Sequence, residues 1–285
     1  MKKLILFVLV ASIFAACQTG TQETVSNAVP TVKNLWQTDT VLTTVESVIY
    51  DPATDALYVS NIAGDPSGKD GNGSIGKVGL DGKVIAAQWV KGMDAPKGLG
   101  ISNGKLYVAD IDRIHEIDIA TATIANSFAV DSAKFLNDIT IDSNGRVFAS
   151  DSNTGNVYLL ENGAVSVWLS GLDGPNGLLA EGDKMMLALW NQKTLNVIDA
   201  GKQVTMKADS LENPDGIEAV GNGGYLVSSW NGMVHYVDQN GKATMIIDTR
   251  ADSISAADIE YIQEKNMLLV PTFFKNTVMA YELTK

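Results

Sequence analysis

Four side chains whose oxygen atoms could bind a hard cation recur at nearly regular intervals along the chain. Each belongs to one of six segments that share a pattern, in which a short apolar run follows the aligned position. The segments are VESVIYD, PKGLGIS, LNDITID, PNGLLAE, PDGIEAV and AADIEYI. The aligned positions, called the ring residues below, are Glu46, Lys97, Asn137, Asn176, Asp215 and Ala257. Calcium takes about six to eight oxygen ligands from carboxylates, amide carbonyls and water. Glu46, Asn137, Asn176 and Asp215 are therefore the candidate ligands of Ca²⁺, or alternatively of Mg²⁺ or another divalent cation.

The same residues have an alternative interpretation as turn formers. Pro-Asn-Gly and Pro-Asp-Gly are also turn sequences, because Asn, Asp and Gly tolerate tight backbone geometry. Turn chemistry does not require Glu46, however, and this favours a metal site. Zinc and copper are disfavoured because the ring residues include neither a histidine nor Cys17, the only cysteine.

The elements that position these residues follow from the repeat. The aligned positions are separated by 51, 40, 39, 39 and 42 residues, and a period of about 40–45 residues is typical of a four-stranded propeller blade. Short apolar runs with period-two alternation and Asn-Gly or Asp-Gly turns indicate β-strands throughout. The sequence therefore predicts an all-β, six-bladed β-propeller over residues 34–285, in which equivalent positions of every blade face one axis.

Two segments fall outside the regular repeat. The segment Leu35–Thr44 precedes the first repeat, and we expect it to form a strand that completes the last blade and closes the ring. A glycine-rich insertion, Gly64–Gly73, lengthens the first repeat. Its residues Asp65, Asp70 and Asn72 could form a flexible turn or bind a second calcium, and the loop could act as a rim or lid over the site.

The N-terminus has the pattern of a bacterial export signal. Lys2 and Lys3 precede an apolar stretch of about eleven residues, too short to span a bilayer as a helix. Cys17 follows Ala15-Ala16, which resembles the lipobox of bacterial lipoproteins. We expect residues 1–16 to be a lipoprotein signal peptide, Cys17 to carry lipid, and residues 17–33 to be a polar tether. The protein would then be exported and anchored to a bacterial membrane, on the periplasmic or cell-surface side.

The composition is acidic. Removal of residues 1–16 leaves 19 basic against 33 acidic side chains, a net charge of −14. A polyanion is a poor partner for such a surface, and we expect no nucleic-acid binding.

The ring motifs carry a family resemblance over residues 46–283. The Glu-then-strand opening, the Asn-Asp of the third repeat, the Pro-Asn-Gly-Leu of the fourth and the Pro-Asp-Gly of the fifth resemble the senescence-marker-protein/gluconolactonase/luciferin-regenerating-enzyme family, and the order Glu, Asn, Asn, Asp is similar to the calcium set of paraoxonases. The resemblance implies a divalent metal held by Glu46, Asn176 and Asp215, with Asn137 at or beside it, and hydrolysis of lactones or related esters. Sugar lactonases of the family carry Arg where Phe135 stands, which argues against a sugar lactone as substrate.

Aromatic residues and histidines complete the set of candidates. Trp190, Trp230, Phe273 and Phe274 lie at the ends of the second strands of the last three repeats, where they could pack between blades or, with Phe135, form an aromatic wall around an apolar substrate. His115 and His235 share one register position in two third strands, which indicates packing. No nucleophile-elbow motif supports a Ser-His-Asp triad.

Two hypotheses of function follow. The first is a divalent-metal-dependent hydrolase of a small lactone or ester, in which Asp215 or Glu46 handles the proton and Lys97 steadies negative charge. The second is a non-enzymatic, lipid-anchored propeller that binds a small ligand or partner and holds a structural calcium.

Overall fold

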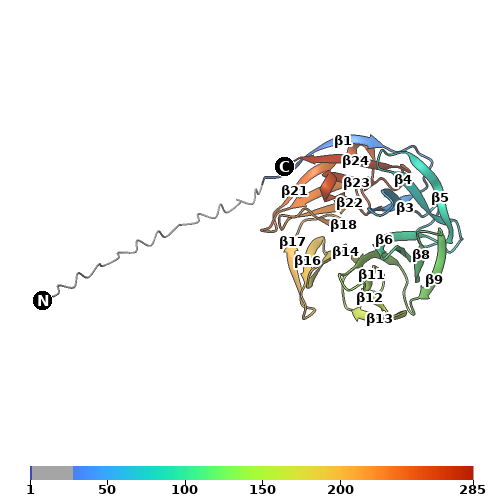
Figure 1. Ribbon diagram of the computed structural model, residues 1–285, viewed down its shortest axis with the longest axis horizontal. Coiled ribbons are helices and arrows are strands. Elements are labelled where there is room, and N and C mark those ends of the chain that lie inside the picture. Colours follow the sequence, from blue (N-terminus) through green and yellow to red (C-terminus); the bar gives the residue numbers. More distant parts are fainter. Residues whose placement is uncertain (2–27, 285) are drawn as a thin grey trace.

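The computed structural model describes Met1 and residues 28–284, and residues 28–284 include six four-stranded antiparallel sheets arranged around an axis (Figure 1). The predicted six-bladed β-propeller is thus confirmed. The proposed signal peptide and Cys17 lie outside the described residues, apart from Met1. No helix within the described part of the chain is long and apolar enough to cross a membrane.

In the first three blades the strands follow one another from the axis outwards. Blade 1 consists of β2 (Val45–Asp51), β3 (Ala56–Asn61), β4 (Gly73–Gly79) and β5 (Val84–Met93). Blade 2 consists of β6 (Pro96–Ser102), β7 (Lys105–Asp110), β8 (Arg113–Asp118) and β9 (Thr123–Ala129). Blade 3 consists of β10 (Leu136–Ile141), β11 (Val147–Asp151), β12 (Asn156–Glu161) and β13 (Ala164–Leu169).

Blades 4 and 5 repeat this order, and blade 6 departs from it. Blade 4 consists of β14 (Pro175–Glu181), β15 (Lys184–Leu189), β16 (Thr194–Ile198) and β17 (Val204–Ala208). Blade 5 consists of β18 (Pro214–Ala219), β19 (Tyr225–Ser229), β20 (Met233–Val237) and β21 (Ala243–Asp248). Blade 6 consists of β22 (Glu260–Ile262), β23 (Met267–Pro271), β24 (Val278–Thr284) and β1 (Thr31–Gln37), and two short 3₁₀ helices, η1 (Arg250–Asp252) and η2 (Gln263–Lys265), flank β22.

The ring closes through the N-terminal strand, as predicted. β1 pairs antiparallel with β24, from Thr31 opposite Thr284 to Gln37 opposite Met279, and the two lie side by side in Figure 1. The strand starts and ends earlier than the expected segment Leu35–Thr44, so it begins inside the range assigned to the tether. Joining the first strand to the last blade ties the two ends of the described domain together.

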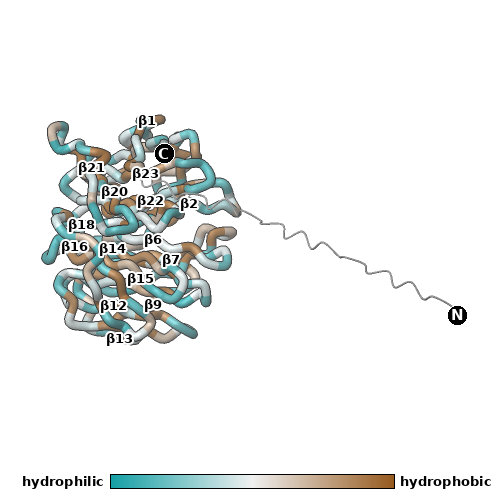
Figure 2. The backbone as a smooth tube through the Cα atoms, turned by 90° about the vertical axis from the view of Figure 1, so that its left-hand side faces the viewer, coloured by the Kyte–Doolittle hydropathy of each residue, from teal (hydrophilic) through white to brown (hydrophobic). Residues whose placement is uncertain are grey.

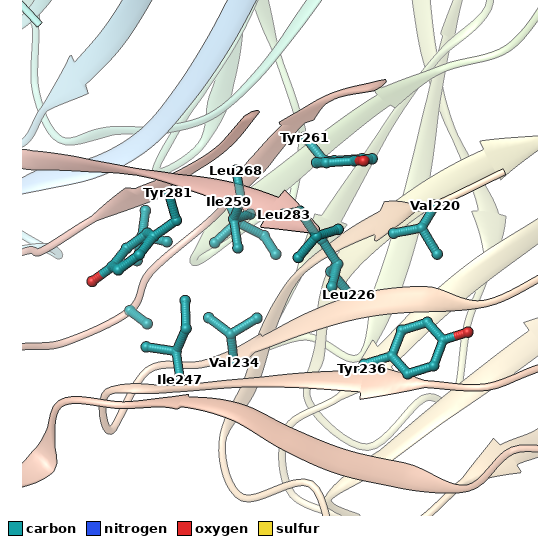
Figure 3. Packing of buried hydrophobic residues seen from close by; sticks show 12 residues of the cluster. Val220, Leu226, Val234, Tyr236, Ile247, Ile259, Tyr261, Leu268, Tyr281 and Leu283 are labelled. Carbon is teal, nitrogen blue, oxygen red and sulfur yellow. The ribbon is translucent and has the colours of Figure 1, made fainter. Parts of the chain in front are cut away.

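The core lies between the faces of neighbouring blades. The second strands β3, β11 and β19 are buried at every residue, whereas the outer strands β1, β9 and β13 are partly exposed. Figure 3 shows Val234 and Ile247 of blade 5 packed towards Leu268 and Tyr281 of blade 6. Hydrophobic stretches run along the strands, and many connecting loops are hydrophilic (Figure 2). Because each blade buries both faces of its inner half, the inner strands hold their ring residues on a rigid frame.

Candidate functional site

The inner strands bring five of the six ring residues around one cavity. Its volume is about 410 Å³, and its lining includes Glu46, Lys97, Asn137, Asn176 and Asp215. Each of these side chains is at most 8% exposed. The sixth ring residue, Ala257, does not line the cavity and packs in an apolar cluster with Ile62 and Phe273. The repeat therefore placed the candidate ligands together, from four different blades.

A β-bulge turns these residues towards the axis. In blades 1 to 5 the pairing between the first and second strands shifts register at the ring residue, for example between Pro214 and Ile217. A bulge frees backbone groups from the ladder and re-aims side chains. In three blades a buried serine hydroxyl accepts a freed N–H, as Ser228 Oγ does from Gly216 N at 2.9 Å.

Glycines after the ring residues allow the inner strands to approach one another. A Cβ on Gly177 would lie 1.9 Å from the carbonyl oxygen of Asp215, and one on Gly216 would lie 2.4 Å from Oδ1 of Asp258. Pro-Asn-Gly and Pro-Asp-Gly both lie within strands, β14 and β18. The interpretation of these motifs as turn formers is therefore wrong: their glycines serve close packing across blades.

The hydrogen bonds of the amides leave oxygen atoms free at the axis. Asn137 donates from Nδ2 to Ser152 Oγ at 3.1 Å, and the Asn176 side chain is hydrogen-bonded to the Asp215 carboxyl group. Within residues 28–284, Oδ1 of Asn176 and Oε2 of Glu46 are buried without a hydrogen-bond partner. Buried acceptors without partners are costly, and a cation would satisfy them. The residues present thus fit a hard divalent cation, although residues 28–284 contain no metal-binding group of three or more His, Cys, Asp or Glu side chains. Two carboxylates supplemented by amide oxygens are a donor set of the calcium type.

The electrostatics of the site also favour a bound cation. Burial, with the charges of Asp215 and Asp258, holds the pKa of Glu46 well above its usual value. Burial and Asp258 likewise raise the pKa of Asp215, although its hydrogen bond with Asn176 opposes the shift. Burial lowers the pKa of Lys97 to about 8, against the pull of Glu46. A divalent cation would favour the charged form of both acids.

A second set of equivalent positions forms the wall of the cavity. In blades 1 to 5, the residue that pairs with the start of the inner strand is the last residue of the second strand, and the residues that directly follow it are Ile62, Ile111, Ser152, Trp190 and Trp230. In blade 6, Phe273 follows the second strand and exchanges backbone hydrogen bonds with Val45 of blade 1. These six residues are called the collar. All except Ile111 line the cavity, as does Phe274. The ring centroids of Trp230 and Phe273 are 5.4 Å apart in an edge-to-face contact, and those of Phe273 and Phe274 are 4.7 Å apart. The aromatic side chains therefore pack on one another and also line the cavity, which combines the two alternatives that the sequence left open.

Phe135 and the insertion complete the wall. The Phe135 ring lies under the Lys97 ammonium, with Nζ 4.4 Å from the ring centroid. The buried Asp151 accepts the backbone N–H of Phe135 at 3.2 Å, which holds this segment in place. From the insertion, Pro66 lines the cavity, and Lys69 forms an ion pair with Asp112.

The acidic residues of the insertion cap its own backbone. Asp65 accepts from Ser67 N at 2.9 Å and Asp70 from Asn72 N at 3.0 Å. These bonds are those of Asx turns. The loop is therefore a rim of the cavity, and the turn interpretation accounts for its carboxylates.

The histidines lie away from the cavity. His115 contacts Asp110 through Nε2 at 3.1 Å and Ser127 through Nδ1 at 2.8 Å. His235 lies on β20, and neither histidine lines the cavity. The packing role expected from their shared register position stays a prediction.

Sequence reasoning missed a polar cluster further along the same inner strands. A second cavity of about 260 Å³ is lined by residues of all six blades, including four acids, Asp138, Glu218, Asp258 and Glu260. Burial raises the pKa of Asp258 to about 7 and that of Glu260 to about 8, and it raises those of Asp138 and Glu218 as well. The signal was present in the sequence, because Asp138 and Asp258 directly follow ring residues.

The fold is shared with solved structures of other proteins. No family model matches the chain, and no curated protein sequence matches it. Similar solved structures include a predicted gluconolactonase, with a TM-score of 0.66 and 15% identity over 90% of this chain and 93% of that one. A luciferin-regenerating enzyme matches with a TM-score of 0.65 and 16% identity over 90% and 96% of the two chains. Virginiamycin B lyase from Staphylococcus aureus, in a catalytically inactive histidine-to-alanine variant with quinupristin, matches with a TM-score of 0.62 and 12% identity over 89% and 99%. At these identities the similarity shows a shared fold.

Proposed function

We propose that this protein is a divalent-metal-dependent hydrolase of small lactones or esters, with calcium as its metal. The observation that carries the proposal is the pair of buried oxygens without partners, Oε2 of Glu46 and Oδ1 of Asn176, at one end of an apolar-walled cavity. Glu46, Asn137, Asn176 and Asp215 would hold the cation. The fold shared with a predicted gluconolactonase and a luciferin-regenerating enzyme supports this class of reaction.

The chain's own groups have defined tasks in such a reaction. A bound divalent cation would polarise the carbonyl oxygen of the substrate and acidify a water molecule. Asp215 or Glu46 would accept the proton of the attacking water. Lys97 donates to the oxygen on which negative charge develops. The collar excludes water from the apolar part of the substrate.

A histidine-dependent lyase reaction has less support. The virginiamycin B lyase among the similar structures is inactive as a histidine-to-alanine variant, and both histidines of this chain lie outside the cavity. The second candidate remains a non-enzymatic binding protein with a structural calcium, because the same oxygens would serve it equally.

A screen of lactones and aryl esters, with and without chelator, separates the two candidates. Hydrolysis of at least one compound that is lost on chelation and restored by Ca²⁺ is the expected result. Calcium binding without any turnover would favour the binding protein.

The aromatic wall predicts the polarity of the substrate. Phe135, Trp190, Trp230 and Phe273 offer no bidentate donor to sugar hydroxyls, and such a charge-assisted interaction is worth ~1.5–3 kcal/mol. Gluconolactone should therefore be a poorer substrate than an apolar lactone, by roughly tenfold or more in kcat/KM. Equal turnover of the two would contradict this substrate class.

We further propose that the protein is exported and anchored to a bacterial membrane through lipid on Cys17. The basis is the sole cysteine directly after Ala15-Ala16 at the end of the apolar stretch. Cys17→Ala should move the protein from the membrane fraction to the soluble fraction without changing its melting temperature. A wild-type protein found only in the soluble fraction would argue against the anchor.

A further inference from the structure

Ser152 is the one polar residue of the collar, and its hydroxyl group joins two blades. It accepts a hydrogen bond from Asn137 Nδ2 at 3.1 Å and donates one to the carbonyl oxygen of Pro175 at 2.9 Å. Pro175 immediately precedes Asn176. The hydroxyl therefore links the candidate ligand of blade 3 to the backbone beside the candidate ligand of blade 4.

The direction of these bonds determines which end of the Asn137 amide faces the cavity. A carbonyl oxygen only accepts, so the single hydroxyl hydrogen of Ser152 is committed to Pro175. The hydroxyl oxygen then offers only lone pairs to Asn137, and only the NH₂ end of the amide can bond to it. The reversed amide would place two acceptors against each other, so Oδ1 of Asn137 is turned away from Ser152.

Ser152 is itself held in place by its backbone. Its N–H donates to the carbonyl oxygen of Phe135 at 3.1 Å, and the buried Asp151 accepts from Asn153 N at 3.0 Å. The two ends of the segment around Ser152 are thus fixed, and the hydroxyl has a defined position relative to Asn137. A hydroxyl on a mobile loop could not select one amide orientation.

The other candidate ligands do not need a hydroxyl group to orient them. Asn176 is oriented by its own hydrogen bond with Asp215. Glu46 and Asp215 are carboxylates, which present oxygen whichever way they turn. Asn137 alone depends on a partner outside the ring residues.

We propose that Ser152 is a positioning residue that selects the oxygen of Asn137 as a cation ligand. The inference rests on the proposed metal site and identifies a residue that none of the candidate motifs contained. Groups that orient metal ligands in this way typically contribute ten- to a hundredfold to affinity.

Calorimetric titration of the chelator-treated mature protein with CaCl₂ tests the proposal. Ser152→Ala should weaken calcium binding by about ten- to a hundredfold, and Ser152→Thr, which keeps the hydroxyl, should restore most of it. Ser127→Ala is the matched control, because it removes a hydroxyl that contacts His115 away from the cavity, and its calcium affinity should equal that of the wild type. If Ser152→Ala does not fold, Ser152→Cys replaces it with the same expectation.

A double-mutant cycle separates orientation from a general effect on the fold. Asn137→Asp presents oxygen in either orientation, so adding Ser152→Ala to it should change calcium affinity by less than about threefold. An equal loss in both backgrounds would overturn the proposal, as would unchanged affinity in Ser152→Ala alone. A wild-type protein that binds neither Ca²⁺ nor Mg²⁺ would instead remove the metal site itself, and with it the proposed function.

Discussion

The two cavities lie at different positions along the same inner strands, and their polar groups differ in how they are hydrogen-bonded. At the ring end, Glu46 and Asn176 keep oxygen atoms without partners. At the far end, Asp138 accepts from Ile139 N and Leu178 N, both at 2.6 Å, and Asp258 accepts from Ser47 Oγ at 2.6 Å. The far-end acids therefore hydrogen-bond the next blade, whereas these two ring-end oxygens have no partner within residues 28–284.

This difference shows that acidity alone does not identify a site. The far end has four acids, one buried and three partly buried, against two at the ring end, yet their bonds to neighbouring strands give them a structural task. The ring end has two acids, amides and Lys97, which together leave a charge of about −1 when all are ionised. In the proposed metal site, a divalent cation would compensate the charge of the ring end, whereas the raised pKa values of the far-end acids favour their protonated form.

The largest expected effect on stability comes from replacing a glycine of an inner strand with alanine, and it should differ between the ring-end and far-end cavities. Gly177→Ala should lower the free energy of unfolding by roughly 3 kcal/mol or more, because its Cβ would meet rigid backbone at 1.9 Å. Gly100→Ala at the far end should cost less than half as much, since its Cβ would meet the side chains of Ile139 and Ile141 at 2.8–3.1 Å. Urea denaturation of both variants measures the difference. Equal costs would mean that the inner strands are not tighter at the ring end.

Removal of the positive charge of Lys97 at the ring end should strengthen calcium binding. Lys97→Met takes one positive charge from beside Glu46, and we expect calcium affinity to rise by about tenfold while turnover falls. Calorimetry and the hydrolysis assay measure the two effects, with the exposed Lys91→Met as control. Weaker calcium binding in Lys97→Met would argue against a calcium site beside Glu46.

An effect that depends on pH is expected when Glu260 at the far end is neutralised. Because the pKa of Glu260 is raised to about 8 in the folded protein, the folded state keeps a proton that the unfolded chain releases above about pH 4.5. Its contribution to stability is therefore present below about pH 4.5 and is lost as the pH rises to about 8. Glu260→Gln should be more stable than the wild type at pH 8–9, by roughly 1–3 kcal/mol, and the advantage should shrink towards pH 4.

Thermal unfolding of metal-free protein across this pH range measures the Glu260 effect. The exposed Glu161→Gln changes the net charge equally and should leave the pH dependence unchanged. Calcium affinity should be the same in Glu260→Gln and the wild type. A variant that is less stable at pH 8 would show that Glu260 is ionised in the fold.

The fold and the ring were predictable because they follow from the repeat. Once six segments align, Glu46, Asn137, Asn176 and Asp215 must face one axis. The far-end acids were not predicted. In blades 1 to 5 a bulge at the ring residue breaks the period-two alternation by which a strand's two faces are assigned.

The collar and Ser152 show a second limit of the sequence. By the strand pairing, Asn61 of blade 1 corresponds to Ser229 of blade 5, so Ile62 and Trp230 occupy equivalent positions, and no sequence motif indicates this match. Ser152 carries no motif, since its partners Asn137 and Pro175 lie in different blades. Bonds between blades depend on tertiary geometry, which local periodicity does not contain.

The most direct test of the account is calcium binding by Asp215→Asn, measured by calorimetry and thermal unfolding of chelator-treated protein. Because four blades contribute the candidate ligands, calcium should bind only the folded wild type and stabilise it, by ~2.7 kcal/mol at a hundred times its dissociation constant. Asp215→Asn keeps the shape of the side chain but removes its charge, so the stabilisation should disappear while the variant stays folded. Asp65→Asn, in the insertion, should bind calcium as the wild type does. Loss of binding in Asp65→Asn with full binding in Asp215→Asn, or no calcium or magnesium binding by the wild type, would contradict a cation site at the ring residues.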